Sequence, residues 1–488
     1  MIYTCRCGTN PRHALCSYDF QVINICRTLL EDEFPATDKQ RAMLTSAALL
    51  GSVVGQLAFG AAADVLGRRG IFIATAIITA LASLGAACAW DSPRLSIYAM
   101  LSLWRFMLGF GIGGEYPLSA AHTAEGTDSR GSGRAMALVY LNMGLGSVAA
   151  PLVVVALMGS GLSRQAVWRA AFGLGALLSA VGAGMRWNVM TETEAFQNVR
   201  LRQRATSEIG VRDAAHVALL SASENGGGRS SEPEAAQQQH APSRLQVLAR
   251  YWRPLLGTAV SWFLYDSVDY GLGLYTADFD STLGLKDDDY GKTLGVLYIA
   301  LLTLPGYGAG VLLVDRLGRR GCQLLGFFGM AAMFFVLVAL WEPLSKVPAL
   351  FLLCYSVQVA FDALGPGMTT YVVPGEIYPT LIRASAHGIS AASGKAGAVL
   401  GTAAFPRLQS AVGLRSVLLI CGCICLFSAV WTLVFTPNYD AATLAAQRTA
   451  EERGDVPDPR ALYRRRRRRD AGSGSSGSYE ELKDSGNH

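Results

Sequence analysis

Long apolar stretches separated by short polar loops run through most of the chain. A helix needs roughly 20 apolar residues to cross a hydrocarbon core about 30 Å thick. Stretches of this kind lie near residues 42–63, 70–90, 96–118, 134–158 and 166–186, and again near residues 254–276, 291–314, 321–341, 347–372, 384–404 and 411–436. The pattern predicts an all-α membrane protein with two matching six-helix halves, provided that one more helix precedes residue 42.

The missing first helix is expected at residues 14–30. This stretch is shorter than the others, carries Asp19 and Arg27, and has only thirteen residues before it. We therefore expect a short first helix in a truncated or mispredicted N-terminus.

A repeated motif supports the two-halved organisation. The sequence DVLGRRG at residues 64–70 recurs as DRLGRRG at residues 315–321, and each copy follows an apolar stretch that ends in small residues. Internal repeats of membrane helices are typical of transporters in which the substrate crosses between the halves. We expect Asp64 and Asp315 to lie at helix ends and to latch neighbouring helices in one conformation, as parts of a gate.

Positive charge distinguishes the two sides of the membrane. The arginines of short loops that fall on one side are Arg68, Arg69, Arg130, Arg134, Arg316, Arg319, Arg320 and Arg383. An excess of Arg and Lys in short loops marks the cytoplasmic side, so we expect both termini to be cytoplasmic. The expected domains are an N-terminal transmembrane half (1–186), a cytoplasmic linker (187–253), a C-terminal transmembrane half (254–436) and a disordered cytoplasmic tail (437–488).

Composition narrows the class of protein further. Among 488 residues, 51% are hydrophobic, 16% are charged and 53 are glycine, which is too apolar for an ordinary soluble enzyme. The net charge of +5 comes from short arginine clusters without a nucleic-acid-binding module. The ten cysteines show neither a disulfide framework nor zinc-ligand spacing. We expect a multi-pass protein of the plasma membrane with no enzymatic activity, cofactor, metal or nucleic-acid partner.

The tail contains six consecutive arginines, Arg464 to Arg469. Such a cluster can bind anionic lipid headgroups next to the bilayer. The simpler interpretation is a solvated, disordered segment, which the surrounding polar composition favours. Contact with anionic lipid is therefore a secondary hypothesis for this cluster.

An acid and a base lie near the centres of two apolar stretches. Asp266 falls in the seventh predicted span and Lys395 in the eleventh. A charged side chain at that depth costs roughly 2.5–3.5 kcal/mol on insertion scales, so it usually lines a cavity or has a partner. We expect both residues to face one cavity between the halves and to hold an anion and a proton. The alternative is a buried pair that only fixes two helices, although apolar packing is usually at least as stable.

Residues around Asp266 form a polar and aromatic stripe. Trp262 lies four positions before Asp266, and Asp269 and Tyr270 follow three and four positions after it, so all four share one helix face. A hydroxyl, an indole N–H and a protonated carboxyl all donate hydrogen bonds to an oxyanion, whereas ionised acids repel it. If Asp266 must be protonated before an anion binds beside it, proton and anion binding are reciprocally coupled, as symport requires.

The fourth predicted span also carries two charges. Arg105 is followed ten residues later by Glu115, within the sequence GGEYP at residues 113–117. Glycine and proline allow helices to bend and approach closely. Glu115 is expected either to relay protons toward the cytoplasm or to form a salt bridge between helices that acts as a strut or gate, and Arg105 is a relay or gate candidate with it. The related sequence PGEIYP in the second half adds Glu376 to the relay or gate candidates.

At these residues the chain resembles the major facilitator superfamily. GIGGEYPLS at residues 111–119 resembles the signature of its phosphate:proton symporter family, and SWFLYD (261–266) and HGISAASGKAG (387–397) resemble that family's seventh and eleventh helices. The resemblance implies the major facilitator fold and proton-coupled uptake of inorganic phosphate by alternating access. Carried over by position, it implies phosphate contacts at Tyr116, Trp262, Asp266, Tyr270 and Lys395.

Several positions depart from the family pattern. Family members usually have Gln where this chain has Met143 and Asn where it has Gly367, so two hydrogen-bond donors are absent. The family's acid in the fourth helix is usually Asp, whereas this chain has Glu115. Its first-helix acid pair is represented here only by Asp19, and Asp269 stands where the family tends to be aromatic. We place Asp19 and Asp269 with the proton relay or gate candidates.

These departures leave other functions open. A reshaped pocket would suit a phosphodiester or another organic anion, and a non-transporting nutrient sensor of the same fold would explain the lost contacts. A sugar porter is less favoured, because sugar sites prefer neutral amides and aromatic side chains. Inorganic phosphate and protons remain the expected partners.

Overall fold

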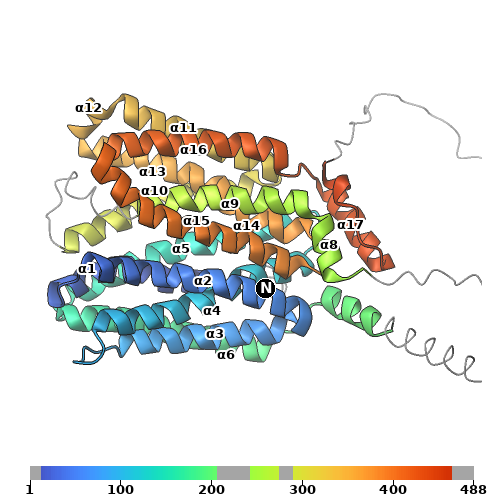
Figure 1. Ribbon diagram of the computed structural model, residues 1–488, viewed down its shortest axis with the longest axis horizontal. Helices are drawn as coiled ribbons and strands as arrows, with labels where there is room; N and C mark the ends of the chain where they lie inside the picture. Colours follow the sequence, from blue (N-terminus) through green and yellow to red (C-terminus); the bar gives the residue numbers. More distant parts are fainter. Residues whose placement is uncertain (1–11, 206–241, 274–288, 464–488) are drawn as a thin grey trace, which may run out of the picture.

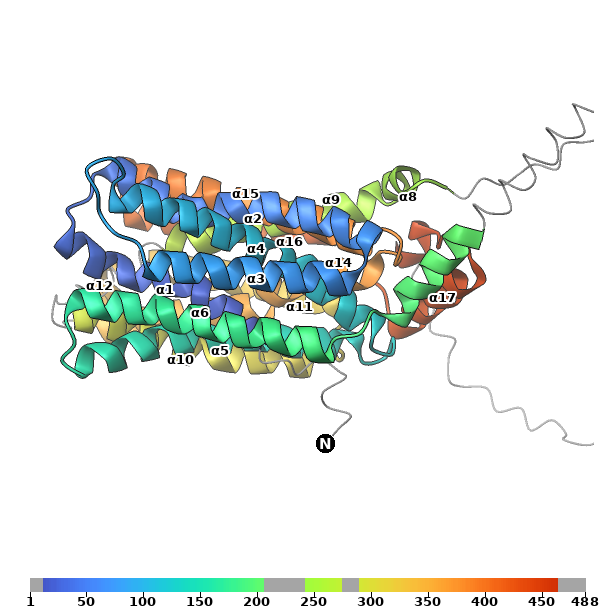
Figure 2. The ribbon, with the colours of Figure 1, turned by 90° about the horizontal axis from the view of Figure 1, so that it is seen from below.

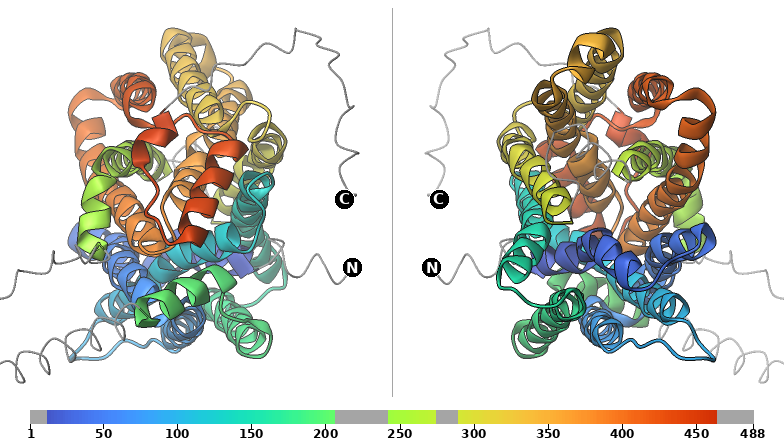
Figure 3. Two further views of the ribbon diagram at one scale, coloured as in Figure 1. Left: turned by 90° about the vertical axis from the view of Figure 1, so that its right-hand side faces the viewer. Right: turned by 90° about the vertical axis from the view of Figure 1, so that its left-hand side faces the viewer.

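Two groups of long helices run side by side along one direction (Figure 1). The computed structural model describes residues 12–205, 242–273 and 289–463. The first group is α1 (Arg12–Glu33), α2 (Asp38–Leu66), α3 (Arg68–Ala87), α4 (Ile97–Glu125), α5 (Ser132–Gly159) and α6 (Arg164–Val189). The second is α9 (Trp252–Gly273), α10 (Asp289–Leu313), α11 (Arg319–Ala339), α13 (Pro348–Leu364), α14 (Pro366–Ile377), α15 (Arg383–Val412) and α16 (Leu414–Phe435). Seen along the helices, the groups form two halves (Figure 3), which confirms the predicted architecture.

The first helix is longer than the sequence predicts. α1 has 22 residues and packs against α5 and α6, so the helix predicted at residues 14–30 is present, but it is longer than expected. Asp19 is only 2% exposed, and Arg27 lines an internal cavity. These polar side chains face the protein interior and lower the average hydropathy of the segment. For this reason, hydropathy underestimates the length of this helix.

Hydropathy separates the helices into two kinds. Nine helices within the described residues are long and apolar enough to cross a membrane. The three long helices that do not meet this criterion are α1, α9 and α15, which carry Asp19, Asp266 and Lys395. Apolar helices such as α3 and α10 instead expose leucines, with Leu81 58% and Leu312 59% accessible. We infer that the apolar helices face lipid and that the polar helices are shielded by them.

The two copies of the repeated motif form equivalent turns. Gly67 follows α2 with φ of 112°, and Gly318 precedes α11 with φ of 75°. Glycine is the residue that adopts such positive φ values without steric cost. The turns place Asp64 in the last turn of α2 and Asp315 just after α10, at helix ends as predicted.

Small residues bring α9 and α15 into close contact. A Cβ atom at Gly397 would lie 2.2 Å from the carbonyl oxygen of Phe263, and one at Gly401 would lie 2.2 Å from the carbonyl oxygen of Ser267. Glycine therefore allows the two backbones to touch, as is typical of membrane helices. This packing holds the helix of Asp266 against the helix of Lys395.

The tenth predicted span is a broken helix. α13 ends at Leu364 and α14 begins at Pro366, with Gly365 between them at φ −109° and ψ −108°. Proline has no backbone N–H and is tolerated where a helix begins. Asp362 and Gly367 therefore lie on either side of a break inside the membrane region. Interrupted helices in transporters commonly carry the substrate or ion site.

The segment after α16 does not continue as the predicted disordered tail. α17 (Ala441–Arg453) and a short 3-10 helix (Pro459–Tyr463) follow it, and Leu444 and Leu462 are buried against Tyr251 and neighbouring residues. The prediction of disorder from residue 437 was therefore wrong for residues 441–463. Scattered apolar residues in a polar stretch give no clear periodicity, and they find partners only in the folded protein.

α17 lies across one end of both halves, which we call the tail end (Figure 3). Arg448 of α17 donates hydrogen bonds to the carbonyl oxygens of Ala124 (2.8 Å) and Thr127 (2.5 Å). The predicted linker contributes α8 (Arg244–Arg250) and a helix at residues 194–205, which lies beside α17 (Figure 2). Arg202 of that helix donates to the carbonyl oxygen of Glu451 at 2.8 Å.

Candidate functional site

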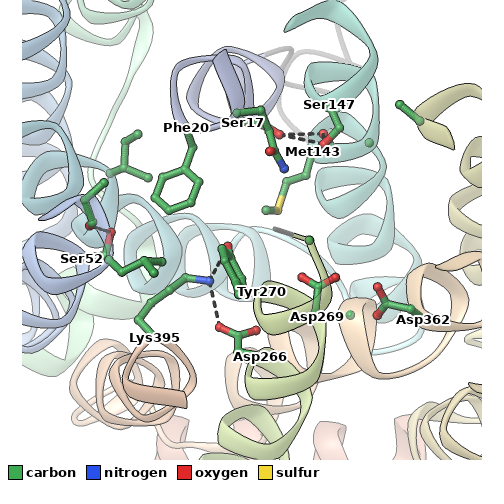
Figure 4. A pocket seen from close by; sticks show the side chains of 18 of the residues that line it. Ser17, Phe20, Ser52, Met143, Ser147, Asp266, Asp269, Tyr270, Asp362 and Lys395 are labelled. Carbon is green, nitrogen blue, oxygen red and sulfur yellow. Dashed lines mark hydrogen bonds and ion pairs between the residues drawn. The ribbon is translucent and has the colours of Figure 1, made fainter. Parts of the chain in front are cut away.

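A cavity of about 300 Å³ lies between the two halves (Figure 4). All five predicted substrate residues line it: Tyr116 from the first half and Trp262, Asp266, Tyr270 and Lys395 from the second. The lining also includes Arg27 of α1 and Thr45 of α2, which lie toward the end opposite the tail end. Residues that are far apart in the sequence therefore meet at one internal site.

Lys395 is the centre of this site. Its Nζ atom lies 2.9 Å from Oδ2 of Asp266 and donates to the hydroxyl of Tyr270 at 2.8 Å (Figure 4). Both charged side chains are buried, with Asp266 1% and Lys395 4% exposed. The Asp–Lys pair is neutral as a whole, so protonation of Asp266 would leave the positive charge of Lys395 available to an anion.

Aromatic rings form a wall beside Lys395. Its Nζ atom lies 4.2 Å from the ring centroid of Tyr270 and 5.7 Å from that of Tyr116. Tyr116 in turn lies 6.2 Å from Trp262, centroid to centroid. Cations are attracted to aromatic faces at these distances. The wall thus connects a residue of the first half to the charged pair of the second.

Two acids occupy another part of the cavity lining. Asp269 was expected from the sequence, but Asp362, at the end of α13, was not. Asp362 is 6% exposed, and the hydroxyl of Tyr265 donates to its Oδ2 atom at 3.5 Å. An ionisable residue within the predicted span 347–372 was the signal that could have identified Asp362.

Arg105 connects α4 to α1. Its guanidinium donates to the backbone carbonyl oxygens of Asp19 (2.8 Å) and Phe20 (3.1 Å). The Asp19 carboxylate accepts a bond of 2.7 Å from the hydroxyl of Ser179 on α6. Arg105 lines the cavity, whereas Asp19 lies behind the lining.

Glu115 forms an ion pair that the sequence analysis did not identify. The Arg186 guanidinium of α6 donates to both carboxylate oxygens, at 2.6 Å for Nη2 to Oε2, and the hydroxyl of Thr75 donates at 3.0 Å. Arg186 lies at the very end of the predicted span 166–186, where it looked like a boundary residue. Glu115 therefore takes part in a salt bridge between helices and also lines the cavity.

A first network joins the two halves at the tail end. The Asp64 carboxylate accepts hydrogen bonds from the backbone N–H of Ser385 (2.7 Å) at the start of α15, where the helix dipole favours an anion. Glu125 pairs with Arg68 of the first half at 2.9 Å and with Arg383 of the second half at 3.2 Å. We call Asp64, Arg68, Glu125 and Arg383 the first latch.

A second network closes the same end around Glu376. Arg319 donates to both oxygens of Glu376 at 2.8 Å, and the hydroxyl of Ser132 on α5 donates to it from the first half. Asp315 pairs with Arg319 at 3.2 Å but is 35% exposed. We call Ser132, Arg319 and Glu376 the second latch.

The second latch corrects one sequence comparison. Glu376 lies at the tail end, whereas Glu115 lies beside the cavity, so their similar motifs do not place them in equivalent positions. The structural counterpart of Glu376 is Glu125, because each binds the arginine that follows the motif glycine. The cluster Arg464 to Arg469, expected to contact lipid, lies outside the described residues.

Comparison with known proteins places the chain in a family. Residues 12–450 match the family model described as sugar (and other) transporter. The chain is 33% identical over 433 residues to a putative inorganic phosphate transporter of Schizosaccharomyces pombe, covering 78% of this chain and 75% of that protein. It is 31% identical over 447 residues to a probable inorganic phosphate transporter of Arabidopsis thaliana, covering 83% of this chain and 85% of that protein.

Solved structures show the same fold. The proton:xylose symporter XylE bound to 6-bromo-6-deoxy-D-glucose matches with a TM-score of 0.70 and 17% identity, over 93% of this chain and 97% of that chain. The chain therefore belongs to the sugar (and other) transporter family of the major facilitator superfamily, which consists of membrane transporters rather than enzymes. The predicted superfamily and fold are confirmed.

Proposed function

We propose that the protein takes up inorganic phosphate together with protons across the plasma membrane, by exposing the central cavity alternately to the two sides. The names of its relatives from S. pombe and A. thaliana support phosphate as the substrate. The observation that carries the proposal is the buried Asp266–Lys395 pair in a cavity lined by both halves.

Lys395 supplies the positive charge for the anion. A phosphate oxygen beside its ammonium group would also accept hydrogen bonds from the hydroxyls of Tyr116 and Tyr270 and from the indole of Trp262. Removing one partner from a buried ion pair costs about 3–5 kcal/mol. Separation of Asp266 from Lys395 is therefore favourable only if the anion takes the place of the carboxylate.

Protonation of Asp266 couples the two substrates. An ionised Asp266 would repel the entering phosphate, whereas a protonated carboxyl is neutral and donates a hydrogen bond. Each ligand then raises the affinity for the other by the same factor. Glu115, Arg105 and Asp19 are proposed to move protons past the cavity or to brace the helices around it.

The latches provide the gate. We infer that the tail end faces the cytoplasm, because the arginine-rich loops lie there. The ion pairs of both latches hold this end closed, while the cavity lining extends toward the opposite end. Phosphate release into the cytoplasm would require Asp64, Asp315 and Glu376 to exchange their partners.

Uptake of radiolabelled phosphate into proteoliposomes under an imposed pH gradient tests the proposal. Wild-type protein should accumulate phosphate, and Asp266→Asn and Lys395→Ala should not. The matched control is Asp455→Asn, which changes an exposed carboxyl near the tail end and should transport normally. The proposal fails if wild-type protein accumulates no phosphate or if both cavity variants accumulate it undiminished.

A phosphodiester is the second candidate substrate. The cavity has a volume of about 300 Å³, equivalent to about ten water molecules at about 30 Å³ each, and it lacks amide side chains at Met143 and Gly367. The volume suits a ligand larger than inorganic phosphate, although the space beside Gly367 is already filled by the hydroxyl of Tyr140. Competition of labelled phosphate uptake by glycerophosphodiesters, sulfate and sugars distinguishes these substrates, since the preferred substrate inhibits at the lowest concentration.

A further inference from the structure

Two carboxyl groups of the cavity form no ion pair among the described residues. Asp266 forms an ion pair with Lys395 and Glu115 forms one with Arg186, while the carboxyl of Asp19 is attracted by the charge of Arg105. Asp269 is attracted only by the charge of Lys395, which is already bonded to Asp266. Asp269 and Asp362 remain, and neither forms an ion pair with an arginine or lysine in the part of the chain that the structure describes. Both line the cavity, and Figure 4 shows them next to each other on adjacent helices.

The carboxylate of Asp362 has one oxygen atom without a hydrogen-bond partner among the described residues. Its Oδ1 atom is buried and has no partner with hydrogen-bond geometry among the described residues. The favourable contacts of the side chain are the Tyr265 hydroxyl, 3.5 Å from Oδ2, and a weak attraction to the backbone amide of Gly367. The charges of Asp269 and Asp266 both act on it unfavourably. A buried polar atom without a partner is costly, so this site is built for an additional positive charge or proton.

Gly367 has no side chain, and this leaves space for the oxygen atoms that surround Asp362. A Cβ atom there would lie 2.3 Å from the hydroxyl oxygen of Tyr140, 3.0 Å from that of Tyr265 and 3.0 Å from Oδ1 of Asp362. Two phenol oxygens and one carboxylate oxygen therefore converge where a side chain would otherwise stand. The break between α13 and α14 lies beside them.

Other titratable groups around the two acids come from six helices. They are Tyr140 of α5, Tyr265, Asp266 and Tyr270 of α9, Tyr307 of α10, Tyr355 of α13, Lys395 of α15 and Cys425 of α16. Phenols and thiols are mainly neutral near pH 7. Lys395 is thus the positive charge of this group, and it is already bonded to Asp266.

We propose that Asp269 and Asp362 form a proton-binding dyad that takes up and releases one proton in each transport cycle, in addition to the proton on Asp266. Two carboxylates in one cavity repel each other when both are ionised, and a proton bound by either of them relieves this repulsion. The proton of the dyad enters together with the anion from the side opposite the tail end, and it leaves at the tail end. This inference rests on the proposed function, because it concerns the number of protons that accompany the anion.

The number of coupled protons can be measured from equilibrium accumulation. In proteoliposomes with the membrane potential held at zero, each coupled proton multiplies phosphate accumulation about tenfold per unit of imposed pH difference, because one pH unit corresponds to a tenfold ratio of proton activity. Asp362→Asn and Asp269→Asn keep the side-chain shape and remove one proton site. Each should lower accumulation about tenfold per pH unit relative to wild type, whereas Asp455→Asn should not.

Phosphate counterflow without a pH gradient serves as the folding and binding control. It needs no net proton movement, so both dyad variants should retain it. The dyad is refuted if accumulation by both variants depends on the pH difference as in wild type, or if both lose counterflow, which would assign the acids to substrate binding. Inhibition of uptake by phosphoethanolamine that disappears in Asp362→Asn would also overturn it, by assigning the acids to a substrate ammonium group. If wild-type protein itself shows neither accumulation nor counterflow of phosphate, the proposed function fails first.

Discussion

The first latch depends on Glu125, so replacing it should open the tail end. Its carboxylate is fully buried and binds Arg68 at 2.9 Å and Arg383 at 3.2 Å. The hydroxyl of Thr193 donates a further hydrogen bond of 2.5 Å. Glu125→Gln keeps nearly the same shape but removes the negative charge that two buried guanidinium groups share.

The expected size of the effect follows from the loss of this charge. Breaking a buried ion pair by removing one partner costs about 3–5 kcal/mol. Arg68 keeps a second carboxylate, Asp64, at 3.1 Å, so we expect the lower value of about 3 kcal/mol. The guanidinium groups become hydrated when the tail end opens, so the cost falls on the closed state alone. The ratio of closed to open protein should therefore fall about a hundredfold, since about 1.4 kcal/mol is a factor of ten.

Hydrogen exchange can measure this opening. The backbone N–H groups of Ala384 and Ser385 donate to Asp64 across the closed tail end, so these two amides, followed in the peptide at residues 380–388, should exchange about a hundredfold faster in Glu125→Gln. The matched control is Asp32→Asn, which breaks an exposed ion pair with Arg164 at the opposite end. Exposed pairs contribute at most about 1 kcal/mol, and this one does not touch the latch. Unchanged exchange in a folded Glu125→Gln protein would refute the reasoning.

Two further substitutions test the packing and the site. Gly397→Val places a side chain against the backbone of Phe263, 2.2 Å from Cβ to the carbonyl oxygen. We expect a loss of roughly 1–3 kcal/mol in stability, seen as a lower unfolding temperature, whereas Gly308→Val, which meets open space, should change it little. Tyr270→Phe removes a hydroxyl that lies 2.8 Å from Nζ of Lys395 and that is proposed to donate a hydrogen bond to the bound phosphate. A hydrogen bond to a charged group contributes about 1.5–3 kcal/mol, so the KM for phosphate should rise at least about tenfold, and an unchanged KM would exclude this contact from the site.

Much of the architecture could be predicted from the sequence because its signals are local. Apolar length identified eleven of the helices, and the repeated glycine motif marked equivalent turns at Gly67 and Gly318. Helical spacing placed Trp262, Asp266 and Tyr270 on one face, and these residues do line the cavity. Each of these predictions needs only neighbours within a few turns of the same helix.

Residues that act through distant partners could not be assigned in this way. Arg186 lies at the end of an apolar stretch and Glu125 lies beyond one, where charges are expected at the membrane surface. Their roles appear only when other helices bring Arg383 and Glu115 beside them. Asp362 was a visible charge within the predicted span 347–372, but the sequence did not show that this span breaks at Gly365 or that Asp362 lines the cavity beside Asp269.

Three long helices of lower hydropathy carry charged residues in or behind the wall of the cavity. α1, α9 and α15 do not reach the composition expected of a membrane span, yet they supply Asp19, Asp266 and Lys395. A polar residue inside a membrane is costly unless it faces a cavity or a partner, so its presence indicates a helix that the others shield from lipid. A charged residue that departs from the apolar composition expected of a membrane helix is thus evidence of function. The same argument extends to Asp362, which interrupts an otherwise apolar helix at the point where the helix breaks.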